Sequence, residues 1–158
     1  MSQLIYIETT IPSFYHEQRQ SPELIAMRNW RREWWSAASA VDRRVASRAV
    51  ISELELTPEP KRTECLALVA GLPMLDDVPE IDDTVAFYIA HKLMPSELIG
   101  DARHLALVAW HRCDVLVTWN CRHIANPNKL EHILHINELL GLHTPVLATP
   151  FQLLEAAK

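Results

Sequence analysis

Short apolar runs alternate along the chain with longer segments in which apolar residues recur every three or four positions. The short runs are typical of buried strands, and the longer segments are typical of amphipathic helices. Strands that alternate with helices predict an α/β fold, a three-layer α/β/α sandwich around a mostly parallel sheet of about four to five strands. The predicted strands are Leu4–Ile7, Arg44–Ser47, Leu72–Leu75, Val115–Trp119 and Pro145–Ala148.

The predicted helices are bounded by residues that favour helix ends. Ser21 and Pro22 predict the start of a long helix that reaches about Val41. Ser47 can cap a further helix, and Gly71 is expected to end another in the left-handed conformation. The shorter predicted helices are Ala49–Glu55, Lys61–Ala70, Ile81–Leu93, Leu105–Arg112 and Asn128–Leu140, followed by a capping box at Thr149–Gln152 that opens a last helix.

Polar side chains follow two of the predicted strands directly. Glu8 comes after Leu4–Ile7, and Asn120 comes after Val115–Trp119. If both strands lie in one parallel sheet, these residues share its carboxyl edge, where open α/β sheets bind their ligands. The charge of Glu8 at the end of a buried strand is costly unless it is paired. Asn120, taken alone, could simply satisfy the hydrogen bonds of a turn.

Four segments, taken in order, resemble a known family, the PIN domain. They are Tyr6-Ile7-Glu8-Thr9, Ser47 followed by Glu53, the segment from Asp101 to Ala106, and Thr118-Trp119-Asn120. More narrowly, the chain resembles the VapC-like toxin ribonucleases of bacterial toxin–antitoxin pairs. The resemblance runs from Tyr6 to Pro150. It implies a metal-dependent endoribonuclease with Mg²⁺ or Mn²⁺ as cofactor, an RNA substrate, a small antitoxin as partner, and a homodimer.

The resemblance also implies a role for each site residue. Glu8 and Asp101 are the expected metal ligands, directly or through water, and both belong to the catalytic set. Glu53 is expected to hold a metal-bound water, with Glu55 as the competing choice, and Asn120 completes the set. Considered without the other residues, Asp101 could simply be a helix cap. The expected substrate-binding residues are Thr9, Thr118, Trp119 and Arg122.

Two positions depart from the family pattern. The first acidic position is more commonly Asp, so Glu8 carries an additional methylene that could move or loosen the ion. Where many members have a further acid, this chain has Arg122, which weakens a second metal site or contacts a scissile phosphate. These departures keep open an alternative, a catalytically weakened PIN-like module that binds RNA or a protein partner in a regulatory role.

Gathered carboxylates predict a hard divalent cation. Like charges in a partly dry site repel one another, so three carboxylates cannot all stay ionised side by side without a cation. Oxygen ligands select Mg²⁺ or Mn²⁺ over zinc, and Mg²⁺ needs only one or two carboxylates besides water and phosphate. Such an ion supports attack of water on a phosphodiester without a covalent enzyme intermediate.

Composition and charge fit one domain covering residues 1–158. The 158 residues are 49% hydrophobic, and the net charge of -5 excludes a broadly basic coat for nucleic acid. An odd count of three cysteines favours reduced intracellular thiols over a disulfide framework. With no apolar stretch near the roughly 20 residues that span a bilayer, we expect a soluble, cytoplasmic protein without membrane contact.

Other clusters have competing interpretations. Cysteine and histidine residues could suggest zinc, but their spacing matches no zinc motif; they are Cys121, His123, His104, His111, His132 and His135. A Ser-His-Asp hydrolase is disfavoured because no Gly-x-Ser-x-Gly elbow exists. Arginines along the first long helix form either a basic stripe for RNA or a partner, or a solvated face packed over tryptophan. Trp30, Trp34 and Trp35 are the predicted place for subunit or antitoxin contacts.

Overall fold

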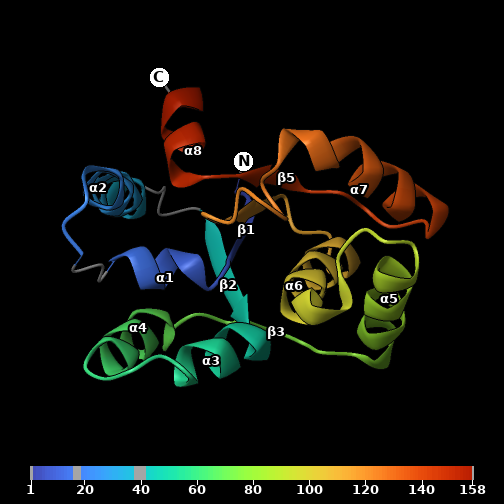
Figure 1. The fold of residues 1–158 in the computed structure, drawn as a ribbon, viewed down its shortest axis with the longest axis horizontal. Coiled ribbons are helices and arrows are strands. Elements are labelled where there is room, and N and C mark those ends of the chain that lie inside the picture. The colour runs from blue at the N-terminus through green and yellow to red at the C-terminus, as the bar shows by residue number, and fades with distance from the viewer. Residues whose placement is uncertain (1, 16–18, 38–41, 158) are drawn as a thin grey trace.

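Five parallel strands form the centre of the protein, in the order β3-β2-β1-β4-β5 (Figure 1). The computed structural model describes residues 2–15, 19–37 and 42–157. The strands are β1 (Leu4–Ile7), β2 (Arg43–Ser47), β3 (Met74–Leu75), β4 (Val115–Val117) and β5 (Val146–Ala148). The predicted α/β class is therefore confirmed, with every strand pair parallel.

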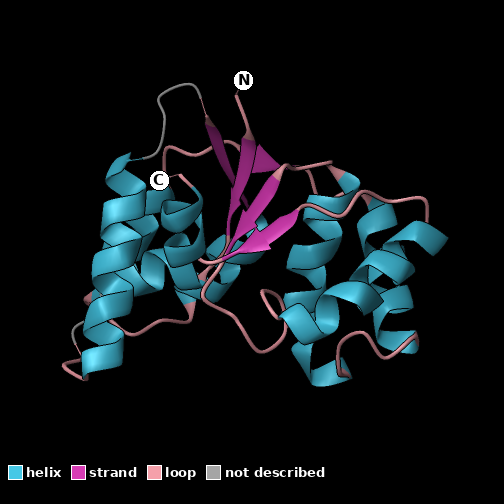
Figure 2. Cartoon of the chain, turned by 90° about the horizontal axis from the view of Figure 1, so that it is seen from above, coloured by secondary structure: helices cyan, strands magenta, loops and turns pink. Residues whose placement is uncertain are grey.

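Helices cover both faces of this sheet, as Figure 2 shows from above. One face carries α1 (Thr10–Tyr15), α2 (Pro22–Ala37) and α8 (Pro150–Ala156). The other carries α3 (Arg48–Glu55), α5 (Pro79–Ala90), α6 (Ile99–Trp110, after the 3-10 turn Ser96–Leu98) and α7 (Pro127–Leu139). Helix α4 (Lys61–Val69) contacts α1 and α3.

The side chains of β1 alternate between the two apolar cores. Ile5 and Ile7 belong to the core under α1, α2 and α8, whereas Tyr6 belongs to the core under α3 and α6. Because side chains alternate along a strand, Glu8 continues on the Tyr6 face. The first strand thus delivers its terminal carboxylate to the side of the sheet where α3 and α6 lie.

The strand order changes direction at β1. From β1 the chain adds β2 and β3 on one side of the sheet and then β4 and β5 on the other. The register pairs Ile7 with Val117 across β1 and β4, so the residues after these two strands are neighbours. Ligands of open α/β sheets bind outside the carboxyl ends of the strands at such a switch point.

Three helices end in the same hydrogen-bonded motif with a left-handed residue. At the end of α6, Cys113 N–H donates to Val108 O (3.0 Å) while Arg112 takes φ 56°. The ends of α5 and α7 repeat these bonds, with Lys92 (φ 60°) and Gly141 (φ 69°) in the left-handed position. Two of the three left-handed residues are therefore not glycine.

Several predicted boundaries differ from the structure. Gly71 does not take a positive φ, so its predicted left-handed helix end is wrong. The predicted continuation of the long helix to Val41 lies at residues 38–41, outside the described residues. Strand β4 ends at Val117, two residues before the predicted end. The capping box at Thr149 and Gln152 is confirmed.

None of the helices built from the described residues combines the length and apolar character needed to cross a membrane.

Candidate active site

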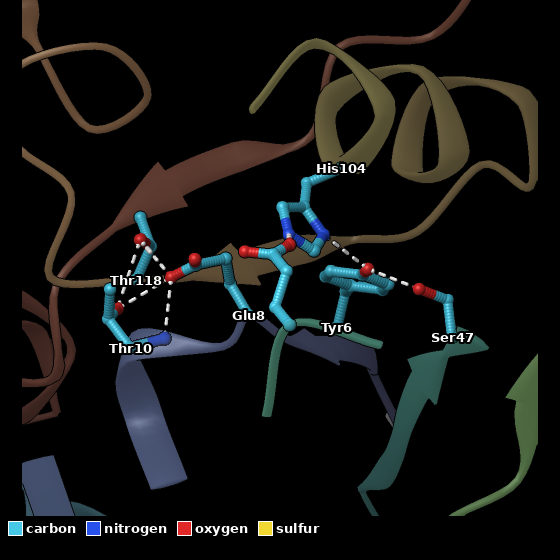
Figure 3. Close-up of polar contacts among 7 residues, drawn as sticks. Tyr6, Glu8, Thr10, Ser47, His104 and Thr118 are labelled. Atoms are coloured by element: carbon cyan, nitrogen blue, oxygen red, sulfur yellow. Dashed lines mark hydrogen bonds and ion pairs between the residues drawn. The ribbon is translucent and has the colours of Figure 1, made fainter. Parts of the chain in front are cut away.

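Glu8 is a buried carboxylate held by hydroxyl and amide donors, and its side chain is only 3% exposed. Its Oε2 atom accepts hydrogen bonds from Thr118 Oγ1 (2.6 Å), Thr10 Oγ1 (2.5 Å) and Thr10 N (3.1 Å) (Figure 3). These donors compensate for the loss of water around one oxygen. The contact joins the ends of β1 and β4, whereas the sequence predicted only that Glu8 and Asn120 share this edge of the sheet.

Glu53 reaches the same region from α3. Its Oε1 atom bonds to Nε2 of His104, a residue of α6 that is fully buried. A Cβ atom added to Gly100 would lie 3.7 Å from Glu53 Oε1, so the carboxylate rests against the first turn of α6. The partial positive charge of a helix N-terminus stabilises a carboxylate there.

The structure favours Glu53 over Glu55 as the glutamate of this region. The two residues lie two positions apart on α3 and therefore point in different directions. Glu53 contacts α6, whereas Glu55 is exposed.

Asp101 lies in the first turn of α6, whose N-cap is Leu98. The interpretation of Asp101 as the helix cap itself therefore does not hold. Its charge acts on His104, His123 and Lys129, so it lies within electrostatic reach of all three. Glu8, Glu53 and Asp101 all act electrostatically on the same imidazole, that of His104.

Asn120 organises the turn that follows β4. Its Oδ1 accepts from His123 N (3.0 Å), and its backbone N–H donates to Thr118 Oγ1 (2.9 Å). Thr118 thus links Asn120 to Glu8, because its hydroxyl accepts one bond and donates the other. The side-chain oxygen of Asn120 therefore does stabilise a turn, as one interpretation of the sequence held. Through Thr118 the residue also lies close to the Glu8 carboxylate.

The expected substrate-binding residues have different surroundings. Thr9 has a buried Oγ1 without a hydrogen-bond partner among the described residues, and the neighbouring Thr10 contacts Glu8 instead. Trp119 lies between helices, with ring centroids 6.3 Å from Phe14 and 6.4 Å from Trp30. Arg122 is exposed in the turn after β4. The roles of Thr9, Trp119 and Arg122 stay predictions.

The sequence did not single out His104, Thr10 or Lys129 as site residues. His104 lies in the segment that carried the resemblance, but it could not be assigned a partner from sequence. Lys129 Nζ lies 3.1 Å from Leu93 O and 3.2 Å from His123 Nδ1. It brings a cation from α7 toward Asp101. No spacing signal in the sequence connects Lys129 or Thr10 with the acids.

Burial and charge shift the ionisation of these groups. Burial is the largest influence on the His104 pKa and lowers it, but the bond with Glu53 and the charges of Glu8, Glu53 and Asp101 outweigh it, so the pKa is raised. Burial raises the pKa of the Tyr6 hydroxyl well above its usual value. The pKa of Lys129 is lowered, first by burial and then by the nearby Arg122. The imidazole of His104 therefore holds a proton more readily than a free histidine does.

The donor set fits a hard cation better than zinc. Among the described residues, no group of three or more His, Cys, Asp or Glu is arranged to hold a metal ion. A magnesium ion needs less, since one or two carboxylates with water and phosphate suffice. Glu8 and Asp101 are the expected carboxylate ligands. Two histidines of the zinc alternative have other contacts, His111 with Asp76 O and His123 with Lys129.

Three cavities of the described residues are not lined by the acids. A cavity of about 260 Å³ lies at the amino ends of the strands, lined by Ile5, Val115 and Trp34 among others. Its lining is mostly apolar, whereas the acids lie at the carboxyl ends. We assign the site by the chemistry of its side chains and by the switch point of the sheet.

Arginines of α2 and β2 pack on tryptophan. The guanidinium carbons of Arg31 and Arg44 each lie 4.4 Å from the ring centroid of Trp35. Arg31 is fully buried and donates to Ile11 O (2.7 Å), and Trp34 is 7% exposed. For Arg31 and Arg44 the structure supports packing over tryptophan rather than a basic stripe.

No family model matches the chain, and a search of curated proteins found no match.

Proposed function

We propose that the protein is a metal-dependent endoribonuclease that hydrolyses phosphodiester bonds of RNA. The observation that carries the proposal is the placement of Glu8, a buried carboxylate at the switch point of a parallel sheet, with Glu53 and Asp101 acting on the imidazole beside it. Glu8, Glu53 and Asp101 stand at the positions that match the first, second and third acidic positions of the PIN domain, which the chain resembles.

Each side chain has a separate role in the proposed hydrolysis. Glu8 and Asp101 would hold Mg²⁺ or Mn²⁺, which would activate a water and neutralise charge on the phosphate oxygens. Glu53 accepts a hydrogen bond from the attacking water and orients it. The attacking water forms a bond to phosphorus and releases a proton to solvent, the bond to one ribose oxygen breaks, and that oxygen takes up a proton. The charges of Asp101 and Arg122 both act on Lys129, so Arg122 and Lys129 would be the cations available to a phosphate.

The VapC-like resemblance extends the proposal to the biology of the protein. In this account the protein is the toxin of a toxin–antitoxin pair, held inactive by a small antitoxin, and it acts in the cytoplasm as a homodimer. The net charge of -5 supports a local mode of RNA binding, through the ion and a few cations, rather than a broad basic surface.

One observation favours a second candidate, a PIN-like regulatory module with weakened catalysis. Glu8 Oε2 already accepts three hydrogen bonds from Thr10 and Thr118, and Asn120 Oδ1 already accepts one from His123. Oxygens that are satisfied internally bind an ion less readily. This module would bind RNA or a protein partner without cutting RNA.

Cleavage assays with two matched variants test the proposal. Labelled structured RNA is incubated with the purified protein in Mg²⁺, in Mn²⁺ and in chelator, alongside Asp101→Asn and Glu55→Gln. We expect metal-dependent cutting that Asp101→Asn lowers by at least about 100-fold and that Glu55→Gln leaves unchanged. Binding of RNA without cutting in either metal would instead support the regulatory module.

A further inference from the structure

A chain of hydrogen bonds runs from the core to Glu53. Ser47 Oγ lies 2.7 Å from the Tyr6 hydroxyl, and the same hydroxyl lies 2.7 Å from His104 Nδ1 (Figure 3). His104 Nε2 then bonds to Glu53 Oε1. Ser47, Tyr6 and His104 are buried, while the Glu53 side chain is 39% exposed. The series of hydrogen bonds therefore begins at Ser47 in the core and ends at Glu53 in the candidate site.

This arrangement has local costs. Ser47 occupies the N-cap position of α3, yet its side chain makes no capping hydrogen bond. A serine cap normally stabilises a helix, and here the hydroxyl contacts Tyr6 instead. Tyr6 and His104 also place polar atoms inside an apolar cluster that includes Val50 and Leu105. Local rules are broken in this way mainly where a functional geometry requires it.

The proton positions in this series of hydrogen bonds follow from the acceptor at its end, the Glu53 carboxylate. An ionised carboxylate only accepts hydrogen bonds, so His104 Nε2 carries the hydrogen shared with Glu53. Nδ1 then accepts from the Tyr6 hydroxyl in a neutral ring or donates to it in a cationic ring. In both cases the bond with Tyr6 fixes the plane of the imidazole, and the imidazole fixes Glu53 Oε1.

We infer that His104 is a positioning residue for Glu53, and that Tyr6 and Ser47 hold the imidazole in place. A partly exposed glutamate has several free torsions, and a fixed Oε1 leaves Oε2 with a defined direction. The inference rests on the proposed function for the use of Glu53 in catalysis. The contact geometry itself can be tested without RNA.

The structure provides a matched control. Tyr88 is also fully buried, and its hydroxyl also bonds to a buried side chain, Asn137 Oδ1. That contact lies between α5 and α7 and does not involve the acids. Tyr6→Phe and Tyr88→Phe each remove one buried hydroxyl from an aromatic ring, so Tyr88→Phe makes the same chemical change away from the acids.

The first readout is the ¹⁵N and ¹H NMR signals of the His104 ring, without metal or RNA. Glu53→Gln and Tyr6→Phe should each shift these signals, and Tyr88→Phe should leave them in place. If Glu53→Gln does not move the ring signals, the positioning contact is absent and the inference is overturned.

The second readout is RNA cleavage. Tyr6→Phe should lower kcat roughly 10- to 100-fold, the usual loss when a supporting hydrogen bond is removed, with KM within about twofold. His104→Gln, which retains an N–H donor, should keep more activity than His104→Leu. Equal cleavage by wild type and Tyr6→Phe would overturn the inference. If the wild type cuts no RNA while the ring signals shift as expected, the proposed reaction fails and the positioning of Glu53 stands.

Discussion

At the residue scale, the site depends on hydroxyl groups as much as on acids. Thr118 donates to Glu8 Oε2 and accepts from Asn120 N–H, so one hydroxyl joins two expected catalytic residues. Tyr6 does the same between Ser47 and His104. Removal of such a hydroxyl leaves buried polar partners unsatisfied, which costs more than an ordinary hydrogen bond contributes.

Thr118→Val should therefore destabilise the protein by about 1–3 kcal/mol, because the Glu8 carboxylate and the Asn120 N–H both lose a partner. The measurement is urea unfolding without metal. Thr84→Val is the control, since the Thr84 hydroxyl donates only to Glu80 O within its own helix. Equal losses for the two variants would contradict the role assigned to Thr118.

The raised His104 pKa predicts a pH dependence of folding stability. A histidine whose pKa is raised by folding contributes stability below its ordinary value of 6.5, and that contribution is lost as the pH rises through the folded value. Wild type should therefore lose stability relative to His104→Leu as the pH rises above 6.5 and through the raised pKa of the folded protein.

Unfolding free energies at several pH values, measured with chelator present, test this dependence. Glu53→Gln should show a smaller decline than wild type, because the bond that raises the His104 pKa is weakened. An unchanged difference between wild type and His104→Leu across this range would show that His104 keeps an ordinary pKa in the folded protein.

At the element scale, the sequence predicted strands better than helix ends. Apolar runs located all five strands, and Thr149–Gln152 located the last helix, because both signals are local. Glycine was a less reliable signal: Gly71 is not left-handed, whereas Lys92 and Arg112 are. In α5 and α6 the buried residues after the helix, Leu93 and Cys113, fix the turn by packing in the core, which no local pattern reveals.

Glycine at the left-handed helix ends should stabilise the protein. Lys92→Gly and Arg112→Gly should each raise the free energy of unfolding by about 0.5–1 kcal/mol, since glycine avoids the strain of a positive φ. Gly141→Ala should lower it by about 1 kcal/mol for the same reason.

Gly71→Ala is the matched control for Gly141→Ala in thermal or urea unfolding. A Cβ at either glycine meets nothing within 4 Å, and only Gly141 has a positive φ. The Gly71 variant should be neutral or slightly more stable. A loss at Gly71 as large as that at Gly141 would contradict the explanation by backbone conformation.

At the scale of the whole molecule, the strand order creates the site. Glu8 and Thr118 are 110 positions apart in sequence and meet because β1 and β4 are neighbours at the switch point. The sequence predicted that Glu8 and Asn120 share one edge of the sheet, because each follows a predicted strand. It did not predict that β1 and β4 are neighbouring strands. It could not identify His104 as a partner of Glu53 either, because residues 104–109 of α6 are all buried and periodicity does not tell which side faces α3.

The chemistry of the cleavage products tests the central claim most directly. RNA is cut with Mn²⁺ in ¹⁸O-labelled water, and the new termini are analysed by mass spectrometry for wild type and Asp101→Asn. If water is the nucleophile, wild type should yield a terminal phosphate monoester with about one ¹⁸O per cut, and both chelator and Asp101→Asn should abolish it. Unlabelled 2′,3′-cyclic phosphates formed in the presence of chelator would contradict metal-dependent hydrolysis by this site.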